Sequence, residues 1–399
     1  MSQLKEQNGS RETFVFPRTP EEELAHLKEL VKGKNIEILP VGNVGYIAFN
    51  KQRTYIAEAP LVLLDWDDTA AQTSTDKRQC WDELEKLGIS KAVIQLCDQI
   101  SRIFVGDVEA TYEPELEMRL LSKALELTQD LTHSQDLSAA LELVRNDLIK
   151  NRNLASYPIH PLIHAIYQST RFSSKLFPDT LETLHKLRGN PQRPINVGLL
   201  TYGDPSFQFE KVRGQLDGND VGIVLLTKAK KGTFLQALLR ENLLKDVPMQ
   251  YTYPETPKQI GIDFAQWQVP IVLFDDDPKQ VESFSSVADA EGIQALGVVR
   301  VRRQRIKHED VETVHGPFVT EIKPSETYLD IDLFNDALQE LHVRAVEKYV
   351  NTTLLEQLKV DPTLIDHPEV IRVLEFIANA RKLDPQTVRA SVMKMRESQ

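Results

Sequence analysis

Apolar runs that alternate with helical stretches constrain the fold of this 399-residue chain more than any other feature of its sequence. Leu61–Leu64 is a continuous apolar run that stops at Asp65, as in a strand buried on both faces of a parallel sheet. An apolar helical stretch lies at Phe234–Leu244. The other strand-like runs are Ile195–Leu200, Val221–Leu226, Ile271–Phe274 and Gln294–Val301. This alternation predicts an α/β fold with a doubly wound parallel sheet and right-handed crossovers.

A long helical block interrupts the alternation after the first strand. Leu137, Leu141, Val144 and Leu148 recur at the spacing of one helix face. We therefore predict an inserted, mostly helical domain over residues 76–189. The α/β core would then comprise residues 59–75 and 190–328. Because the insertion leaves from the carboxyl end of its strand, it is expected to lie on that side of the sheet.

The two ends of the chain are predicted to be extensions of this core. Residues 1–58 contain a helix that begins at Pro20 behind the cap residue Thr19, followed by the strand-like runs IEILPV and VGYIAF, which suggest a hairpin or edge strands. Residues 329–399 form a helical extension with at least three helices, because Asp361-Pro362 and Asp384-Pro385 are typical helix starts.

The role of the C-terminal extension is expected to be structural or partner-binding. About 70 residues are marginal for an independent core without disulfides or metal. Its apolar stripes are therefore expected to pack on the α/β core, on the inserted domain, or on a second copy of the chain. The motif residues all precede residue 280, so no catalytic group is expected from this segment.

Composition and charge restrict the compartment and the partners. With 59 acidic and 47 basic residues the net charge is −12, which disfavours nucleic-acid binding. The basic run VVRVRRQRIK at residues 298–307 is interpreted as an edge strand whose charges discourage further pairing. The chain has two cysteines, no apolar stretch of 18 residues and no apolar signal core among its first residues, so we expect a cytoplasmic protein without a membrane span.

Polar residues follow three of the predicted strands, and they carry the functional signal. The first strand is followed by Asp65-Trp66-Asp67-Asp68-Thr69, the second by Thr201, and the fourth by Asp275-Asp276-Asp277. The carboxyl ends of parallel strands meet at one edge of a sheet, where ligands bind. Crowded carboxylates there would repel one another, and a divalent cation is the natural compensation. All-oxygen ligands favour Mg²⁺.

The same segments resemble the motifs of the haloacid dehalogenase-like phosphohydrolase superfamily. LVLLDWDDT is similar to its first motif, NVGLLTYGD to its second, TKAKKGTFLQALL to its third and IVLFDDDPKQV to its fourth. They occur in the family's order, with 136, 30 and 44 positions separating Asp65, Thr201, Lys231 and Asp275. The resemblance implies a Rossmann-like core with a helical cap inserted after the first motif.

The resemblance also implies a hydrolytic mechanism centred on two carboxylates. Asp65 would be the nucleophile that forms an aspartyl-phosphate, and Asp67 the general acid and base. Members that cleave carbon–halogen bonds lack the second acid of the first motif, so the presence of Asp67 favours phosphate chemistry. The implied substrate is a small phosphorylated metabolite. The alternatives are a phosphotransferase or mutase, or a catalytically weak protein that binds a phosphorylated ligand or a protein partner.

Metal and phosphate ligands follow from the same motifs. Mg²⁺ would bind the Asp65 carboxylate, the Asp67 main-chain carbonyl and Asp275, with Asp276 in support. Thr201 and a lysine would bind the phosphoryl oxygens.

Two assignments within these motifs are ambiguous. The lysine could be Lys228, Lys230 or Lys231, and we select Lys231 because it stands directly before Gly232 and a helix, where the lysine of the family commonly stands. In the run of three acids, the common Asp-Asp-Ser-Pro pattern of the family selects Asp275 and Asp276, which leaves Asp277 to cap the helix that starts at Pro278.

Overall fold

The computed structural model describes most of the chain. The described residues are 18–51, 55–56, 60–103, 111–128, 134–151, 153–172, 176–188, 196–217, 221–241, 249–250, 271–291, 295–302, 319–322 and 331–398. Among these residues, no helix is both long enough and apolar enough to cross a membrane. The aromatic run YTYPETP at residues 251–257 lies outside them.

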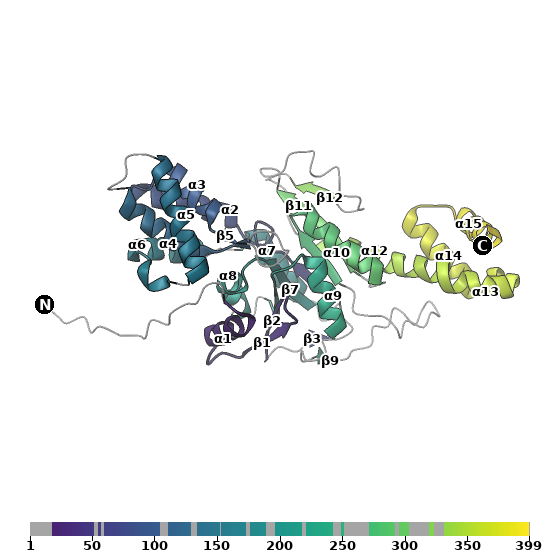
Figure 1. Cartoon of the computed structure of the whole chain (residues 1–399). Helices are drawn as coiled ribbons and strands as arrows, with labels where there is room; N and C mark the ends of the chain where they lie inside the picture. Colours follow the sequence, from purple (N-terminus) through teal and green to yellow (C-terminus); the bar gives the residue numbers. More distant parts are fainter. Residues whose placement is uncertain are drawn as a thin grey trace. The chain divides into compact units, whose positions relative to one another are not determined.

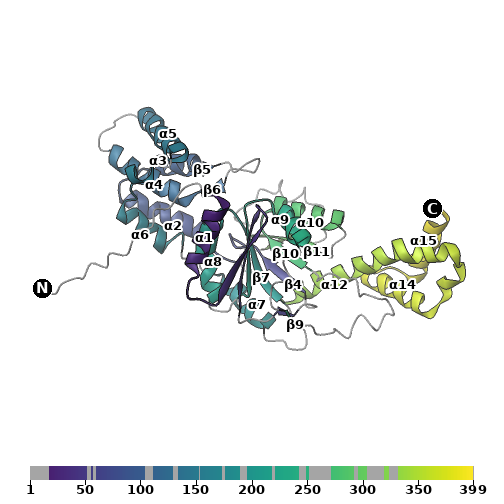
Figure 2. The same cartoon turned by 60° about the horizontal axis from the view of Figure 1, so that its bottom comes forward.

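The α/β part of the chain is built on an eight-stranded sheet (Figures 1 and 2). In order across the sheet, its strands are β1 (Ile36–Val41), β2 (Gly45–Asn50), β8 (Ile223–Thr227), β7 (Asn196–Tyr202), β4 (Leu61–Leu64), β10 (Ile271–Asp275), β11 (Ala295–Arg302) and β12 (Val319–Ile322). The pairs β7–β4, β4–β10, β10–β11 and β11–β12 are parallel, whereas β1–β2 and β2–β8 are antiparallel. The chain has the predicted α/β class.

Both faces of the central strands are buried, which explains their continuous apolar sequences. All four residues of β4 and all five of β10 are buried. On one face, alternate residues such as Leu61, Leu63 and Leu273 share a cluster with Phe234 of α9 (Lys231–Glu241) and Phe284 of α10 (Pro278–Glu291). A strand whose apolar residues do not alternate with polar ones has to be covered by other elements, and these helices provide that cover on one face.

The N-terminal segment is partly integrated into the sheet. Helix α1 (Pro20–Leu30) begins as predicted, with a capping box between Thr19 and Glu22. β1 and β2 form the predicted hairpin, but β2 also pairs with β8, and each of its six residues is buried. This hairpin of the predicted N-terminal extension is therefore part of the same sheet as the strands of the predicted core. Its pairing partner is some 175 residues away in sequence, so no local pattern could reveal it.

The basic run after residue 298 occupies a different position from the one predicted. β11 is not an edge strand, because β12 pairs with it from Val299 to Arg302. The edge interpretation of this run is therefore wrong. The rest of the run, residues 303–307, lies outside the described residues.

The chain divides into two compact units. The first comprises Met1–Lys34, Gln72–Lys175 and Tyr202–Gly214, and the second comprises Asn35–Ala71, Leu176–Thr201 and Gln215–Gln399. The division differs from the predicted domain boundaries, because α1 and most of α8 (Pro205–Asp217) group with the inserted helices. Conversely, α7 (Pro178–Arg188) groups with the sheet.

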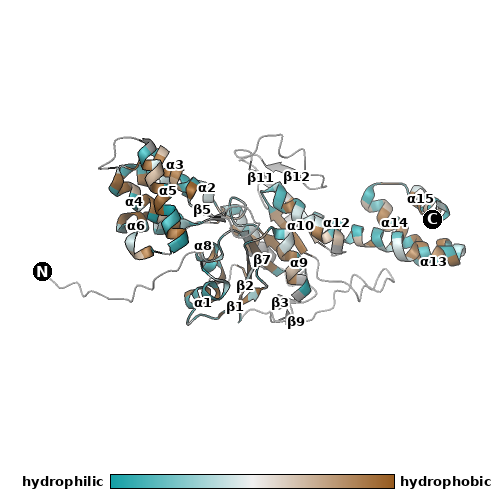
Figure 3. Cartoon of the chain, in the orientation of Figure 1, coloured by the Kyte–Doolittle hydropathy of each residue, from teal (hydrophilic) through white to brown (hydrophobic). Residues whose placement is uncertain are grey.

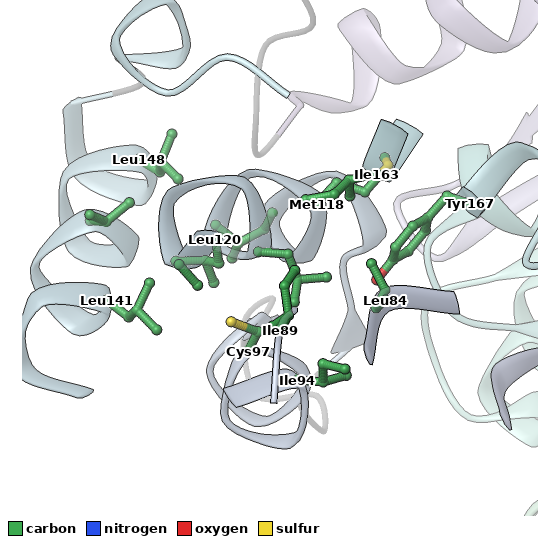
Figure 4. Close-up of a cluster of buried hydrophobic side chains, with 14 of the residues drawn as sticks. Leu84, Ile89, Ile94, Cys97, Met118, Leu120, Leu141, Leu148, Ile163 and Tyr167 are labelled. Carbon is green, nitrogen blue, oxygen red and sulfur yellow. The ribbon is translucent and has the colours of Figure 1, made fainter. Parts of the chain in front are cut away.

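The first unit is built mainly from helices around its own apolar core (Figure 4). Its inserted helices are α2 (Thr73–Lys86), α3 (Lys91–Ile100), α4 (Pro114–Leu127), α5 (Ser134–Asn151) and α6 (Pro161–Ser169). A two-stranded hairpin joins α3 and α4, made of β5 (Arg102–Ile103) and β6 (Thr111–Tyr112). The leucine and valine stripe predicted for one helix face lies on α5 and is buried in this core.

The C-terminal extension has an apolar core of its own. Its helices are α12 (Ile331–Tyr349), the π-helical turn η4 (Val350–Leu354), α13 (Leu355–Val360), the 3₁₀ turn η5 (Pro362–Asp366), α14 (Pro368–Arg381) and α15 (Pro385–Ser398). Figure 3 shows hydrophobic and hydrophilic stretches on each of α13 to α15. Asp384 accepts a hydrogen bond from the backbone of Thr387 at the predicted start of α15, whereas Asp361 accepts one from the backbone of Thr363 and caps the 3₁₀ turn η5 instead of an α-helix.

This core corrects one expectation about the same segment. The apolar stripes were expected to need another part of the protein to pack on, but those after residue 345 pack on one another. The cluster extends from Val346 of α12 to Val392 of α15. Arg381 on α14 also bonds Glu340 and Glu347 on α12, which fixes these two helices together. Folding α13 to α15 back on α12 brings together stripes that are short individually.

Gly232 lets α9 and α10 approach each other closely, which gives a stability test. A Cβ at this position would lie 2.1 Å from the carbonyl oxygen of Ser283, so one helix must shift. Gly232→Ala is expected to lower the free energy of unfolding by about 3 kcal/mol. The control is Gly214→Ala in α8, where nothing lies within 4 Å of the added Cβ. There the gain in helix propensity is expected to be about 0.5–1 kcal/mol. Urea unfolding of both variants measures the difference, and equal effects would contradict the steric explanation.

Candidate active site

The three strands that precede the predicted site residues lie side by side in the sheet. β4 is flanked by β7 and β10, and Leu64 pairs with both Leu199 and Phe274. The backbone N–H of Asp65 donates to the carbonyl of Phe274 at 2.8 Å. Because all three strands run in the same direction, the residues that follow them meet at one edge of the sheet.

A buried ion-pair cluster occupies this edge. The Lys231 ammonium donates hydrogen bonds to Asp65 Oδ1 and to Asp275 Oδ2, the second at 2.6 Å. Lys231 and Asp275 are each 1% exposed, and Asp65 is 6% exposed. Of the three lysines that the sequence left open, Lys231 is thus the one that contacts the acids. Lys230 is exposed, and the Lys228 ammonium lies 6.0 Å from the ring centre of Tyr46.

Three carboxylates of this cluster are arranged closely enough to share a cation. One oxygen each from Asp65, Asp275 and Asp276 lies within 4.8 Å of the others. The Thr69 hydroxyl donates to Asp276 Oδ1 at 3.4 Å, which links the loop after β4 to the second acid of the fourth motif. Oxygen donors of this kind fit a hard divalent cation such as Mg²⁺.

Asp277 does not join these carboxylates. Its side chain is exposed and accepts from the Lys279 backbone N–H at 2.9 Å, which caps the start of α10 as predicted. Its own backbone N–H donates to Asp275 Oδ1 at 2.9 Å and so helps to orient that carboxylate.

Burial and charge shift the pKa values of the cluster in defined directions. Burial raises the pKa of Asp65 well above its usual range; Lys231 opposes the shift and the neighbouring carboxylates add to it. Burial likewise raises the pKa of Asp275, against the attraction of Lys231. Burial alone would lower the pKa of Lys231, but Asp275 and Asp65 outweigh it and hold that pKa above its usual value. The ammonium is therefore charged, and it compensates the acids only in part.

A tight loop after β4 holds Asp67, the second acid of the first motif, close to Asp65, the first acid of that motif. The backbone N–H of Ala70 donates to Asp65 O at 3.1 Å, and that of Ala71 donates to Trp66 O at 2.9 Å. Asp68 takes a left-handed conformation (φ 57°) within this turn. Asp67 is half-buried, and its charge contributes to the raised pKa of Asp65, so the two carboxylates interact.

Thr201 and Gln280 complete the neighbourhood. Thr201 is fully buried near the end of β7, two residues beyond the Leu199 that pairs with Leu64. Gln280, in the first turn of α10, accepts from the backbone N–H of Lys231 at 3.0 Å. No sequence pattern indicates a role for this residue, because its partner lies on another helix and glutamine is common on helix surfaces.

Comparisons with known proteins find similar solved structures. No family model and no curated protein matches the chain. A haloacid dehalogenase-like hydrolase from Burkholderia xenovorans is 16% identical over 66% of this chain and 92% of its own length, with a TM-score of 0.35. One from Xanthomonas campestris is 15% identical over 72% of this chain and 98% of its own length (TM-score 0.35). A 2-haloacid dehalogenase from Pseudomonas syringae is 14% identical over 60% of this chain and 86% of its own length, with a TM-score of 0.32.

Because these identities and TM-scores are low, the resemblance depends on features of the chain itself. The first, second and fourth motifs end adjacent parallel strands, and the lysine of the third bonds the acids of the first and fourth. A helical insertion follows the first of these strands. The motifs and the order of the strands that carry them are thus arranged as the resemblance to the haloacid dehalogenase-like superfamily implies.

Proposed function

We propose that this protein is a Mg²⁺-dependent phosphohydrolase that acts on small phosphorylated metabolites through an aspartyl-phosphate on Asp65. The observation that carries the proposal is the placement of the Lys231 ammonium between Asp65 and Asp275. A buried cation beside a buried nucleophilic carboxylate is suited to attract a phosphate group and to stabilise the charge on its oxygens.

The chemistry assigns different tasks to the two acids of the first motif. A carboxylate oxygen of Asp65 attacks phosphorus while the bond to the leaving oxygen breaks, and Asp67 donates a proton to that oxygen. Asp67 then accepts a proton from a water whose oxygen attacks the same phosphorus. The bond from Asp65 to phosphorus breaks, and inorganic phosphate and the free carboxylate are released. The half-buried position of Asp67 leaves it access to water.

The carboxylates of Asp65, Asp275 and Asp276 would hold the metal, with the main-chain carbonyl of Asp67. A bound Mg²⁺ supplies positive charge that keeps Asp65 ionised and offsets the charge of the phosphoryl oxygens. Lys231 and Thr201 bind those oxygens from the protein side. The donor set fits because its three carboxylates carry more negative charge than one ammonium neutralises.

A panel of phosphate esters tests the proposal. The purified protein is expected to release phosphate from a generic aryl phosphate with Mg²⁺ and to stop when EDTA is added. A metabolite panel then identifies the substrate class. Mg²⁺-dependent stabilisation by a phosphorylated ligand without turnover of any ester would instead favour a binding role. Transfer of the phosphate to an acceptor other than water would favour a phosphotransferase.

The pH dependence of metal binding follows from the raised pKa values of Asp65 and Asp275. Protons compete with Mg²⁺ for these carboxylates at a higher pH than they would for exposed ones. Lowering the pH through their pKa range is expected to weaken Mg²⁺ binding by about tenfold per pH unit for each proton displaced. Calorimetry in buffers of different ionisation enthalpy measures both the affinity and the protons released. An affinity that stays constant down to pH 5 would contradict the proposed ligands.

A further inference from the structure

The position of Lys231 depends on where helix α9 begins. Lys231 is the first residue of α9, and its backbone N–H is one of those at a helix N-terminus that have no partner within the helix. This N–H donates to Gln280 Oε1 at 3.0 Å. Gln280 is 7% exposed, so a water molecule would not readily replace its side-chain oxygen as the acceptor for the Lys231 N–H. The glutamine thus fixes the backbone from which the lysine side chain extends.

A second contact holds the start of α9 against α10. The Cα of Gly232 approaches α10 so closely that a Cβ would lie 2.1 Å from the carbonyl oxygen of Ser283. The hydrogen bond and the close approach are adjacent on α9, at its first and second residues. The first turn of α9 therefore has little freedom to slide along α10.

Helix α10 is itself tied to the acids of the fourth motif. It begins at Pro278, three residues after Asp275, and Asp277 caps its first turn. Gln280 thus belongs to the segment that carries Asp275. That segment also holds the helix that carries Lys231, so both partners of the ion pair are positioned by one element.

The amide of glutamine suits this position for an electrostatic reason. Asp65, Asp275 and Asp276 already gather near one ammonium, and a further negative charge would add to their repulsion. An apolar side chain would leave the Lys231 N–H buried without an acceptor, which costs about 1–3 kcal/mol. A neutral acceptor avoids both costs.

We infer that Gln280 is a positioning residue, which holds the start of α9 so that the Lys231 ammonium stays between Asp65 and Asp275. The effect on turnover depends on the proposed function, since it assumes that Lys231 binds the phosphoryl group. The effect on the placement of Lys231 does not depend on it.

Two substitutions by side chains of similar size distinguish the effect of the hydrogen-bond acceptor of Gln280 from the effect of its side-chain volume. Gln280→Met removes the acceptor but keeps an unbranched, helix-compatible side chain. Gln280→Glu keeps a side-chain oxygen, and burial beside other carboxylates favours its neutral form. Glu282→Gln is the control, because Glu282 is exposed on the same helix.

The first readout is the ¹⁵N-lysine ammonium resonance of Lys231 in the protein without substrate, identified by its loss in Lys231→Met. Gln280→Met is expected to shift or broaden this resonance, while Gln280→Glu and Glu282→Gln leave it in place. The second readout is steady-state turnover with Mg²⁺. Gln280→Met is expected to lower kcat about tenfold with KM changed less than about threefold, and Gln280→Glu to restore most of kcat.

An unchanged Lys231 resonance in Gln280→Met would overturn the inference. So would a shifted resonance with wild-type kcat, because the bond would then stabilise the helix start without affecting the site. If the wild-type protein hydrolyses no ester, the proposed function fails. The resonance still decides whether Gln280 positions Lys231.

Discussion

Asp65→Asn is expected to reduce phosphate release by about 10⁴-fold or more, because it removes the proposed nucleophile. An amide oxygen is a poor nucleophile, and no carboxylate that the structure places elsewhere in the cluster substitutes for it. Asp275 and Asp276 are placed to share a metal ion, and Asp67 is the general acid and base in the proposed mechanism. The loss should appear in kcat at saturating substrate and Mg²⁺.

The fold of this variant should remain intact. Burial raises the pKa of Asp65, so its charged form opposes folding above the pKa of the unfolded chain. A neutral amide removes that cost, and the thermal midpoint is not expected to fall. Asp277→Asn is the matched control, because its side chain is exposed and an asparagine still caps α10. Wild-type turnover by Asp65→Asn would refute the nucleophile assignment, and a similar loss in Asp277→Asn would point to a change in α10 instead.

The parts of the site that the sequence predicted are those with strong local patterns. An apolar run without polar alternation, such as Leu61–Leu64, indicates a strand buried on both faces. A carboxylate directly after it then marks the edge where ligands bind. Asp65 and Asp275 follow such runs, and the structure brings them to adjacent strands. Lys231 could be chosen over its neighbours through the resemblance, because it stands directly before Gly232 and a helix, where the lysine of the family commonly stands.

Features that depend on distant pairing could not be predicted in the same way. The hairpin of β1 and β2 has the local pattern of an edge pair, and its partner β8 follows far along the chain. β12 covers β11, although the charged residues there resemble those of an edge strand. Gln280 acts on Lys231 across a contact between two helices. In each case the stabilising interaction is made with a partner that is distant in the sequence, and sequence periodicity does not identify such partners.

Lys231→Met is expected to affect both stability and activity, because it leaves two buried carboxylates without their cation. Removing one partner of a buried ion pair costs about 3–5 kcal/mol, less whatever the remaining acids recover by taking up a proton. The free energy of unfolding without metal should therefore fall by about 3 kcal/mol. Turnover should fall about 10²–10³-fold, because the loss also removes charge stabilisation from the phosphoryl oxygens.

Mg²⁺ distinguishes this explanation from a simple packing defect. A divalent cation bound by Asp65, Asp275 and Asp276 would replace the missing positive charge, and binding to the folded state alone adds stability as its concentration rises. The gain in thermal midpoint with Mg²⁺ should thus be larger in Lys231→Met than in the wild type, while turnover stays low. Lys230→Met is the matched control, since this exposed lysine is the preceding residue and should change neither property. If both variants lose stability equally, or if Mg²⁺ stabilises Lys231→Met no more than the wild type, the ammonium does not balance these carboxylates. The lysine would then have to act at the site by shape rather than by charge.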